Sequence, residues 1–214
     1  MKAFISLLVG AFTAGVVAKG GRATNKSDAF LPDGYTSIPF SMKGAIEPGG
    51  EVMQFNGTVT DIFEQIQDIK PNFKWDDFQP VAPLTRRRRP SKRTKSHIIC
   101  DVPNVQPSIR LRFLFGQDYL WKIQQPCEVA GGPRKCALLW CDYDSTIYLC
   151  NDNTEPISRN CRDIASYVRD LLGDLDCATT PSDSDNADSW LDAPLKGQEF
   201  DTDNFNVIVG GGGC

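Results

Sequence analysis

The sequence predicts an α+β fold, a small disulfide-stapled two-layer sandwich with elements in the order β-α-β-β-α. Short strand patterns alternate with helical patterns in the second half of the 214-residue chain. All eight cysteines lie there, between Cys100 and Cys214. The N-terminus has the pattern of a signal peptide, and cysteines that pass through an oxidising compartment pair with one another. We therefore expect up to four disulfides.

Residues 1–18 have the three parts of a secretory signal peptide. Lysine is the second residue, an uncharged run extends from Ala3 to Val17, and Val16-x-Ala18 precedes polar residues. As a helix this run is about 22 Å long, whereas the core of a bilayer is roughly 30 Å thick. We therefore expect a secreted, extracellular protein with no stable membrane insertion.

A basic run divides the remaining chain, because residues 86–95 hold seven of the 23 Lys and Arg residues. Such a run is typical of a phosphate-binding segment, an extended linker or a dibasic processing site. A secreted chain does not meet DNA before export, and no proline follows Lys92-Arg93, so we favour cleavage after Arg93. The predicted parts are a pro-segment over 19–93, a cysteine-rich domain over 94–177, and an acidic, mostly flexible tail over 178–214.

The pro-segment contains one strand and one amphipathic helix. Residues 51–55 alternate as in a strand, which Asn56-Gly57 ends. Thr58 and Asp61 fit a capping box, and the helix they begin continues to Pro71. Its apolar stripe consists of Val59, Ile62, Phe63, Ile66 and Ile69. A unit this small cannot bury the stripe by itself, so the stripe must pack against the rest of the chain. The segment is then either an intramolecular chaperone or inhibitor, or the first part of one unprocessed domain.

The cysteine-rich domain contains a strand, a helix, a hairpin and a second helix. Pro107 fits the first turn of the first helix, which Gly116 weakens by about 1 kcal/mol. The hairpin turns at residues 142–145, and Ser158 can cap the second helix. In chain order the strand covers 97–101, the first helix 107–120, a loop 126–133, the hairpin strands 137–141 and 146–150, and the second helix about 160–172.

The last part of the chain is acidic. Residues 178–203 carry seven Asp or Glu against one Lys, which indicates a weakly structured tail. Residues 205–209 nevertheless have the pattern of a short strand. If this strand joins the sheet, the order becomes β-α-β-β-α-β, the ferredoxin-like arrangement; otherwise the sheet has three strands.

The segment Cys136-Ala-Leu-Leu-Trp-Cys141-Asp-Tyr-Asp-Ser-Thr-Ile-Tyr-Leu-Cys150-Asn-Asp-Asn resembles a family of small secreted cysteine-rich fungal proteins. The resemblance extends over most of residues 48–177, through Gly57-Thr58, Cys100, Tyr119-Leu120 and Cys177. It implies a signal peptide, a pro-segment with a dibasic end, and a role as an effector, in some cases with a killer-toxin-like α/β sandwich. Cys127, Cys161 and Cys214 are additional to the family's frame. The disulfide pairing therefore stays open, and Cys127 or Cys161 with Cys214 is one option.

Few residues suggest chemistry. Asn151-Asp152-Asn153 predicts a turn, because Asn and Asp bond to their own backbone. The alternative is a calcium or carboxylate site that adds Glu155, Asp142 and Asp144. His97 is the single histidine, expected on a surface strand or, alternatively, as a base beside Asp101 or Asp152. We expect no metal and no cofactor, because the sequence has neither a second histidine nor a Cys-x-x-Cys pair. Asn25 and Asn56 begin N-glycosylation sequons.

These observations predict a non-enzymatic, effector-like protein that acts by binding a host or competitor target. Residues 94–214 hold 10 Lys or Arg and 18 Asp or Glu, a net charge of −8, which excludes nucleic acid as a bulk electrostatic partner. The alternatives are a small secreted hydrolase or nuclease that uses His97 with an Asp, and a killer-type toxin. Cys214, at the end of four glycines, could link two chains as a dimer.

Overall fold

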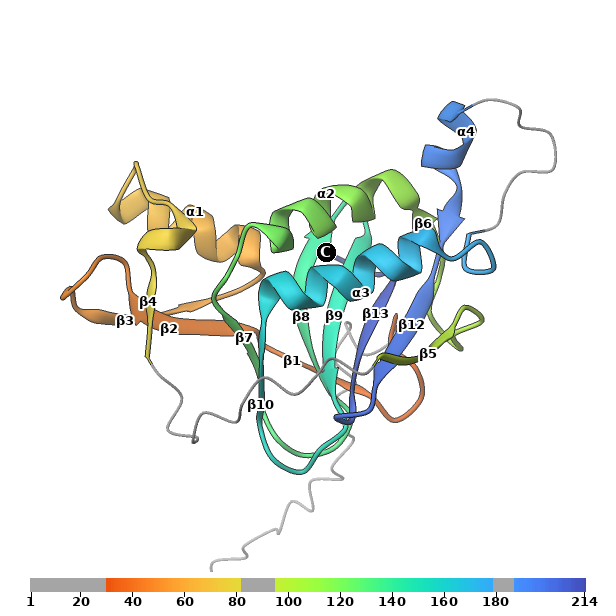
Figure 1. Cartoon of the computed structure of the whole chain (residues 1–214), viewed down its shortest axis with the longest axis horizontal. Helices are drawn as coiled ribbons and strands as arrows, with labels where there is room; N and C mark the ends of the chain where they lie inside the picture. The colour runs from red at the N-terminus through yellow and green to blue at the C-terminus, as the bar shows by residue number, and fades with distance from the viewer. Residues whose placement is uncertain (1–29, 82–94, 179–186) are drawn as a thin grey trace, which may run out of the picture.

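The computed structural model describes residues 30–81, 95–178 and 187–214 (Figure 1). The signal peptide, Asn25 and the cleavage site at Lys92-Arg93 lie outside these residues, so the predictions about them stay predictions. The described residues form a mixed α+β fold stapled by four disulfides, as predicted. No helix in the described ranges is long and apolar enough to cross a membrane.

A six-stranded sheet, in the order β1-β8-β9-β13-β12-β5, lies at the centre of the molecule. The first strand runs parallel to β8, and the other neighbours are antiparallel. The predicted hairpin is present as β8 and β9, joined by a two-residue turn in which Tyr143 and Asp144 both have positive φ. The strands are β1 (Thr36–Ile38), β5 (Lys95–Ile99), β8 (Lys135–Asp142), β9 (Ser145–Asn151), β12 (Gly197–Asp201) and β13 (Phe205–Gly211).

The terminal strand predicted at 205–209 joins the sheet as β13, but the order is not ferredoxin-like. Strand β5 lies at an edge, and β12 separates it from β13. The prediction of a mostly flexible tail is wrong for residues 194–211, which lie largely in strands. The acidic composition of this segment predicted a weakly structured tail. In β12, however, Glu199 and Asp201 are buried and paired inside the fold.

Two helices, α2 (Arg110–Trp121) and α3 (Cys161–Gly173), cover one face of this sheet (Figure 1). Helix α2 begins three residues later than predicted, because β6 (Ser108–Ile109) pairs with β11 (Pro194–Leu195). Gly116 lets α2 approach the sheet, since a Cβ there would lie 2.6 Å from Ile147 Cδ1. The cap of α3 is Asn160 rather than Ser158, because Asn160 directly precedes the helix and its side chain accepts the N–H of Arg162, whereas Ser158 lies two residues earlier in a short strand. That strand, β10 (Ile157–Asn160), pairs with β7 (Pro126–Val129). Strand β7 lies in the segment predicted to be a loop.

The eight cysteines form four disulfides within the chain. The pairs are Cys100–Cys177, Cys127–Cys161, Cys136–Cys150 and Cys141–Cys214. Cys127 and Cys161 therefore bond to each other, and the option of either with Cys214 is wrong. Since the sulfur of Cys214 is bonded to Cys141, a dimer link through Cys214 would have to replace that bond.

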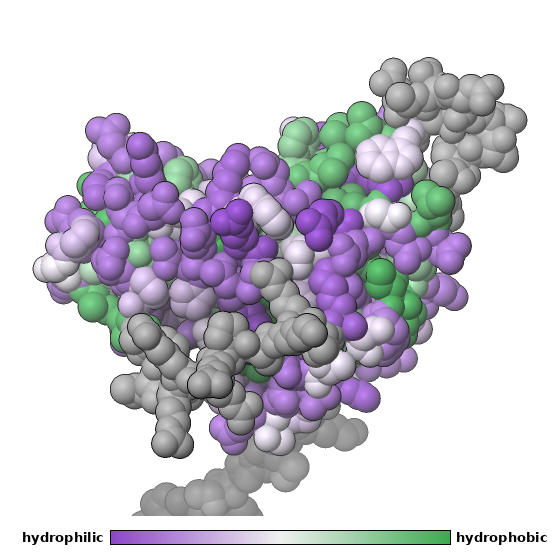
Figure 2. Space-filling view, viewed as in Figure 1, coloured by the Kyte–Doolittle hydropathy of each residue, from purple (hydrophilic) through white to green (hydrophobic). Residues whose placement is uncertain are grey.

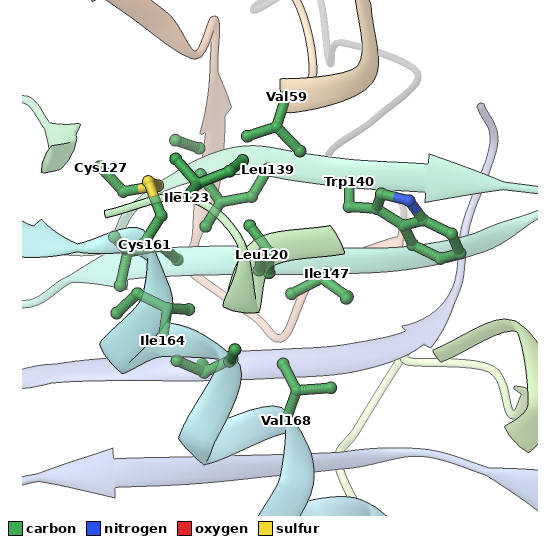
Figure 3. Packing of buried hydrophobic residues seen from close by; sticks show 14 of the residues in the cluster. Val59, Leu120, Ile123, Cys127, Leu139, Trp140, Ile147, Cys161, Ile164 and Val168 are labelled. Carbon is green, nitrogen blue, oxygen red and sulfur yellow. A yellow bond between two sulfur atoms is a disulfide. The ribbon is translucent and has the colours of Figure 1, made fainter. Parts of the chain in front are cut away.

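Residues 30–81 form an N-terminal unit whose core continues into the rest of the molecule. The predicted capping box is present, with the backbone N–H of Thr58 donating to Asp61 at 2.8 Å. Val59, Ile62 and Ile66 of the predicted stripe are buried in the main core, where Val59 lies beside Leu139 (Figure 3), and Phe63 packs against it partly buried. Ile69 does not belong to the buried face, because it is 52% exposed. The elements of this unit besides β1 are β2 (Ser41–Ala45), β3 (Val52–Asn56), α1 (Val59–Ile69), the 3₁₀ turn Trp75–Asp77 and β4 (Gln79–Pro80).

A second, smaller core covers the opposite face of the sheet. It contains Tyr148 and Ile208 from the strands, and Val102 and Val105 from the segment after β5. Leu31, from the start of the N-terminal unit, completes it. The N-terminal unit thus contributes to both faces as well as to the edge strand β1.

Candidate functional site

The Asn151-Asp152-Asn153 motif forms the predicted turn. The Asn151 side-chain oxygen accepts the backbone N–H of Asn153 at 2.9 Å. Asp152 accepts hydrogen bonds from Tyr35 (3.2 Å) and Asn206 (2.7 Å), which connects the turn to the N-terminal unit and to β13. Burial and the Asp152 charge raise the pKa of Tyr35 to about 12, so its hydroxyl stays protonated as a donor. These hydrogen bonds give Asn151-Asp152-Asn153 the structural role of a turn that joins neighbouring elements.

Two of the carboxylates proposed for a calcium site, those of Asp142 and Asp152, already have partners in the fold. Asp142 pairs with Arg112 at 3.3 Å, and Asp144 lies in the hairpin turn, where its carbonyl accepts the N–H of Gly212. In the described residues, the grouping with metal-ligand spacing is Cys100, Asp174 and Cys177. Two of these ligands are bonded to each other as a disulfide, so this grouping does not provide a metal site.

His97 lies on an exposed position of β5, as the surface interpretation predicts. Its ring stacks on Phe200 with centroids 4.6 Å apart, and its Nδ1 is 3.0 Å from the Ser96 hydroxyl. The carboxylates proposed to assist it have other partners: Asp101 pairs with Lys196, and Asp152 binds Tyr35 and Asn206. No described carboxylate forms a catalytic pair with this histidine.

A charged cluster beneath α3 was not predicted. Lys95 donates to the Ser166 carbonyl and to Asp170 of α3, and lies 3.6 Å from Glu199 of β12. Burial raises the pKa of Glu199 to about 7, against the attraction of Lys95, and its Oε2 has no hydrogen-bond partner. The Glu199-x-Asp201 alternation was a usable sequence signal, because both side chains point to one face of a strand. Glu199 is 3% exposed, whereas Lys95 and Asp170 are partly exposed, so the cluster lies at the margin of the interior with its glutamate inside.

Arg110, at the start of α2, is buried and has no charged partner among the described residues. Arg110 is 1% exposed, and its Nε and Nη1 make no hydrogen bond. Its guanidinium lies 3.7 Å from the ring centroid of Trp190, in the short helix α4 (Ala187–Asp192). Burial also lowers the pKa of Arg110. A buried, unpaired cation is costly, so it is the least expected feature of this core.

Exposed aromatic side chains lie on α2 and against the two arginines of its first turn, Arg110 and Arg112. Trp190 is 40% exposed and Phe115 is 53% exposed. Tyr143 projects from the hairpin turn, 77% exposed, and the guanidinium of Arg112 lies 4.1 Å above its ring. Its φ of 43° is costly for a bulky residue, and such strain clusters at functional positions.

These side chains form one region, which we call the α2 surface. Figure 2 shows apolar surface gathered over the part of α2 nearest to α4. The residues that define the region are Ile109, Arg110, Arg112, Phe115, Tyr143 and Trp190.

The start of α3 lines an open pocket of about 380 Å³. It lacks the combination of a buried arginine and exposed aromatic side chains that the α2 surface has. The Asn160 side chain accepts the N–H of Arg162 at 3.0 Å and donates to the Gln124 carbonyl at 2.9 Å. Arg162 also lies over an aromatic ring, that of Trp121, but the helix has an acidic residue, Asp163, in its first turn. The side chain of Asn160 at this pocket is therefore already partnered, and Asp163 supplies a negative charge beside Arg162.

Comparison with known proteins gives no relative: no family model, curated protein or solved structure matches this chain. The structure thus shows a small disulfide-rich α+β fold, and no family is identified for it. Four disulfides indicate an oxidising environment, as is typical outside the cell.

Proposed function

We propose that the protein is secreted and acts outside the producing cell by binding a protein target through the α2 surface. The observation that carries this proposal is that exposed Phe115, Tyr143 and Trp190 lie in the same region as Arg110 and Arg112. Aromatic residues and arginine dominate the binding energy of protein interfaces, whereas a monomer rarely leaves such a group exposed without use.

The disulfide framework supports an extracellular role. Four bridges join α3 to β7, the segment after α3 to the end of β5, the two hairpin strands to each other, and the C-terminus to β8, which suits a small protein that must persist outside the cell. An effector role, and kinship with the small secreted fungal proteins that the cysteine motif resembles, are part of the same proposal.

The hydrolase or nuclease alternative has less support. His97 stacks on Phe200, and the carboxylates proposed to assist it are bound elsewhere. Glu199, whose pKa lies near neutrality, is covered by the fold. Binding through the α2 surface requires no rearrangement of these groups.

Site-specific photo-crosslinking tests the proposal. A photoreactive phenylalanine analogue would replace Phe115 in one variant and Ile69 of α1 in a matched control, because the two residues are 53% and 52% exposed. Each variant would be incubated with extracellular extracts of candidate host or competitor cells and irradiated. We expect a discrete adduct from position 115 and none from position 69. Equal labelling from both positions, or no adduct from position 115, would contradict the proposal.

A further inference from the structure

The unpaired charge of Arg110 sits at the start of α2, where other features also favour an anion. The N-cap residue, Ile109, has no side chain that can accept the first N–H groups of the helix, and within the described ranges only the first of these groups, the N–H of Arg110, has an acceptor outside the helix, the Ala193 carbonyl at 3.1 Å. The first turn contains no acidic residue. A helix start carries partial positive charge, and here a buried cation adds to it instead of a compensating acid.

The contacts of Arg110 leave its donors available. The only side-chain partner that the described residues give it is the Trp190 ring, on the face of the guanidinium. Guanidinium N–H groups lie in the plane of the group, so stacking on an aromatic ring consumes no hydrogen-bond donor. The nearby Arg112, by contrast, is engaged by Asp142 and by Tyr143. Arg110 is therefore the cation in this region that lacks a counter-charge.

We propose that the start of α2 binds an oxyanion, which in the working complex is the carboxylate of an acidic side chain on the protein target. This inference rests on the proposed function and names the chemistry of its central contact. Ile109 and Phe115 would cover the ion pair with apolar groups, which exclude water and strengthen a charge-assisted hydrogen bond. Because Arg110 is buried beneath Trp190, the six-residue helix α4 must shift for the carboxylate to reach it.

Unfolding of the full secreted chain in the presence of small anions tests the site without the target. The probes are inorganic phosphate and acetate, each titrated at constant ionic strength against chloride. The variants are Arg110→Met, which removes the unpaired charge, and Arg162→Met, a matched control in which another arginine that lies over a tryptophan is lost. Any general effect of phosphate on protein hydration should be the same in all three proteins.

We expect both anions to raise the unfolding midpoint of the wild type and of Arg162→Met in a saturable way. Arg110→Met should show no saturable rise, and should be at least as stable as the wild type without added anion, because the substitution removes a buried unpaired charge. Anion responses that are equal in all three proteins would overturn the site. A response to phosphate but not to acetate would overturn the assignment to a carboxylate. Failure of crosslinking from position 115 would count against the proposed function alone, since these measurements contain no target.

Discussion

The N-terminal unit and the cysteine-rich region are stabilised in different ways. Residues 95–214 contain all eight cysteines, and each of their four disulfides closes within that region. Residues 30–81 have no cysteine and attach through the edge strand β1 and a shared apolar core. One region is therefore constrained in its unfolded state, whereas the other depends on burial in the folded state.

The difference shows that a disulfide-bonded region can provide the apolar surface against which a region without disulfides folds. Val59, Ile62 and Ile66 of α1 are fully buried, although α1 belongs to a unit too small to bury them alone. If the chain is cleaved after Arg93, as the sequence predicts, no disulfide in the described structure would join the two products. Four experiments that perturb one region or the other test whether the two regions are stabilised in these different ways, and their expected effects decrease in order.

Loss of a long-range disulfide should have the largest effect. Cys100–Cys177 spans 77 residues and Cys136–Cys150 spans 14, so the chain-entropy model gives about 4.5 and 3 kcal/mol respectively. Replacing each pair by serine should lower the free energy of unfolding in this order, measured by urea denaturation. A larger loss from the short bridge would show that native packing around the sulfurs, rather than loop closure, sets the contribution.

A cavity in α1 should weaken the N-terminal unit while the disulfides stay intact. Ile62→Ala removes a side chain with 0% exposure and should cost about 2–5 kcal/mol, whereas Ile69→Ala on the exposed side should stay within about 0.5 kcal/mol. Hydrogen exchange should accelerate in α1 before it does in β9. Uniform acceleration across both regions would mean that they unfold only together.

Glu199 should make the stability of the cysteine-rich region depend on pH. Its pKa rises from 4.5 to about 7 in the folded protein, so the folded state holds a proton that the unfolded state releases. This contribution is complete below about pH 4.5 and is lost as the pH rises through 7. The loss is on the order of 2 kcal/mol.

The Glu199→Gln variant removes this titration. We therefore expect its free energy of unfolding, relative to the wild type, to rise between pH 4.5 and pH 8. Asp170→Asn is the control, because Asp170 also faces Lys95 but is more exposed. A difference between wild type and Glu199→Gln that does not change with pH would show that Glu199 titrates normally.

Helix caps provide the smallest test. Thr58→Ala in α1 and Asn160→Ala in α3 should each cost about 1 kcal/mol. Helix α3 begins at a disulfide-bonded cysteine, so its first turn should fray less than that of α1 in hydrogen-exchange measurements. Equal fraying of the two helix starts would mean that the bridge adds no local order there.

Local patterns in the sequence predicted the three longer helices and the strands β3, β5, β8, β9 and β13, but not the short strands. The capping box at Thr58, the hairpin around residues 142–145 and the periodicity of α3 each depend on neighbouring residues only. Strands β1 and β12 were missed because distant residues complete them: β1 pairs across a separation of nearly a hundred residues, and β12 is acidic.

The candidate site was largely unpredictable for the same reason. Arg110 and Trp190 come from segments 80 positions apart, and neither has an unusual local sequence. What distinguishes Arg110 is the missing counter-charge, which depends on the three-dimensional surroundings. The contact of Trp190 with this arginine joins two segments that no local pattern relates.

Controlled cleavage between the two regions is the most direct test of whether they share an apolar core and no disulfide. Residues 86–93 would be replaced by the recognition sequence of a specific protease, and the cut protein would be analysed by native mass spectrometry and by denaturing, non-reducing electrophoresis. We predict one complex of both pieces under native conditions and two separate chains under denaturing, non-reducing conditions. Release of the N-terminal piece under native conditions, or its retention after denaturation without reduction, would contradict the shared core or the disulfide pairing.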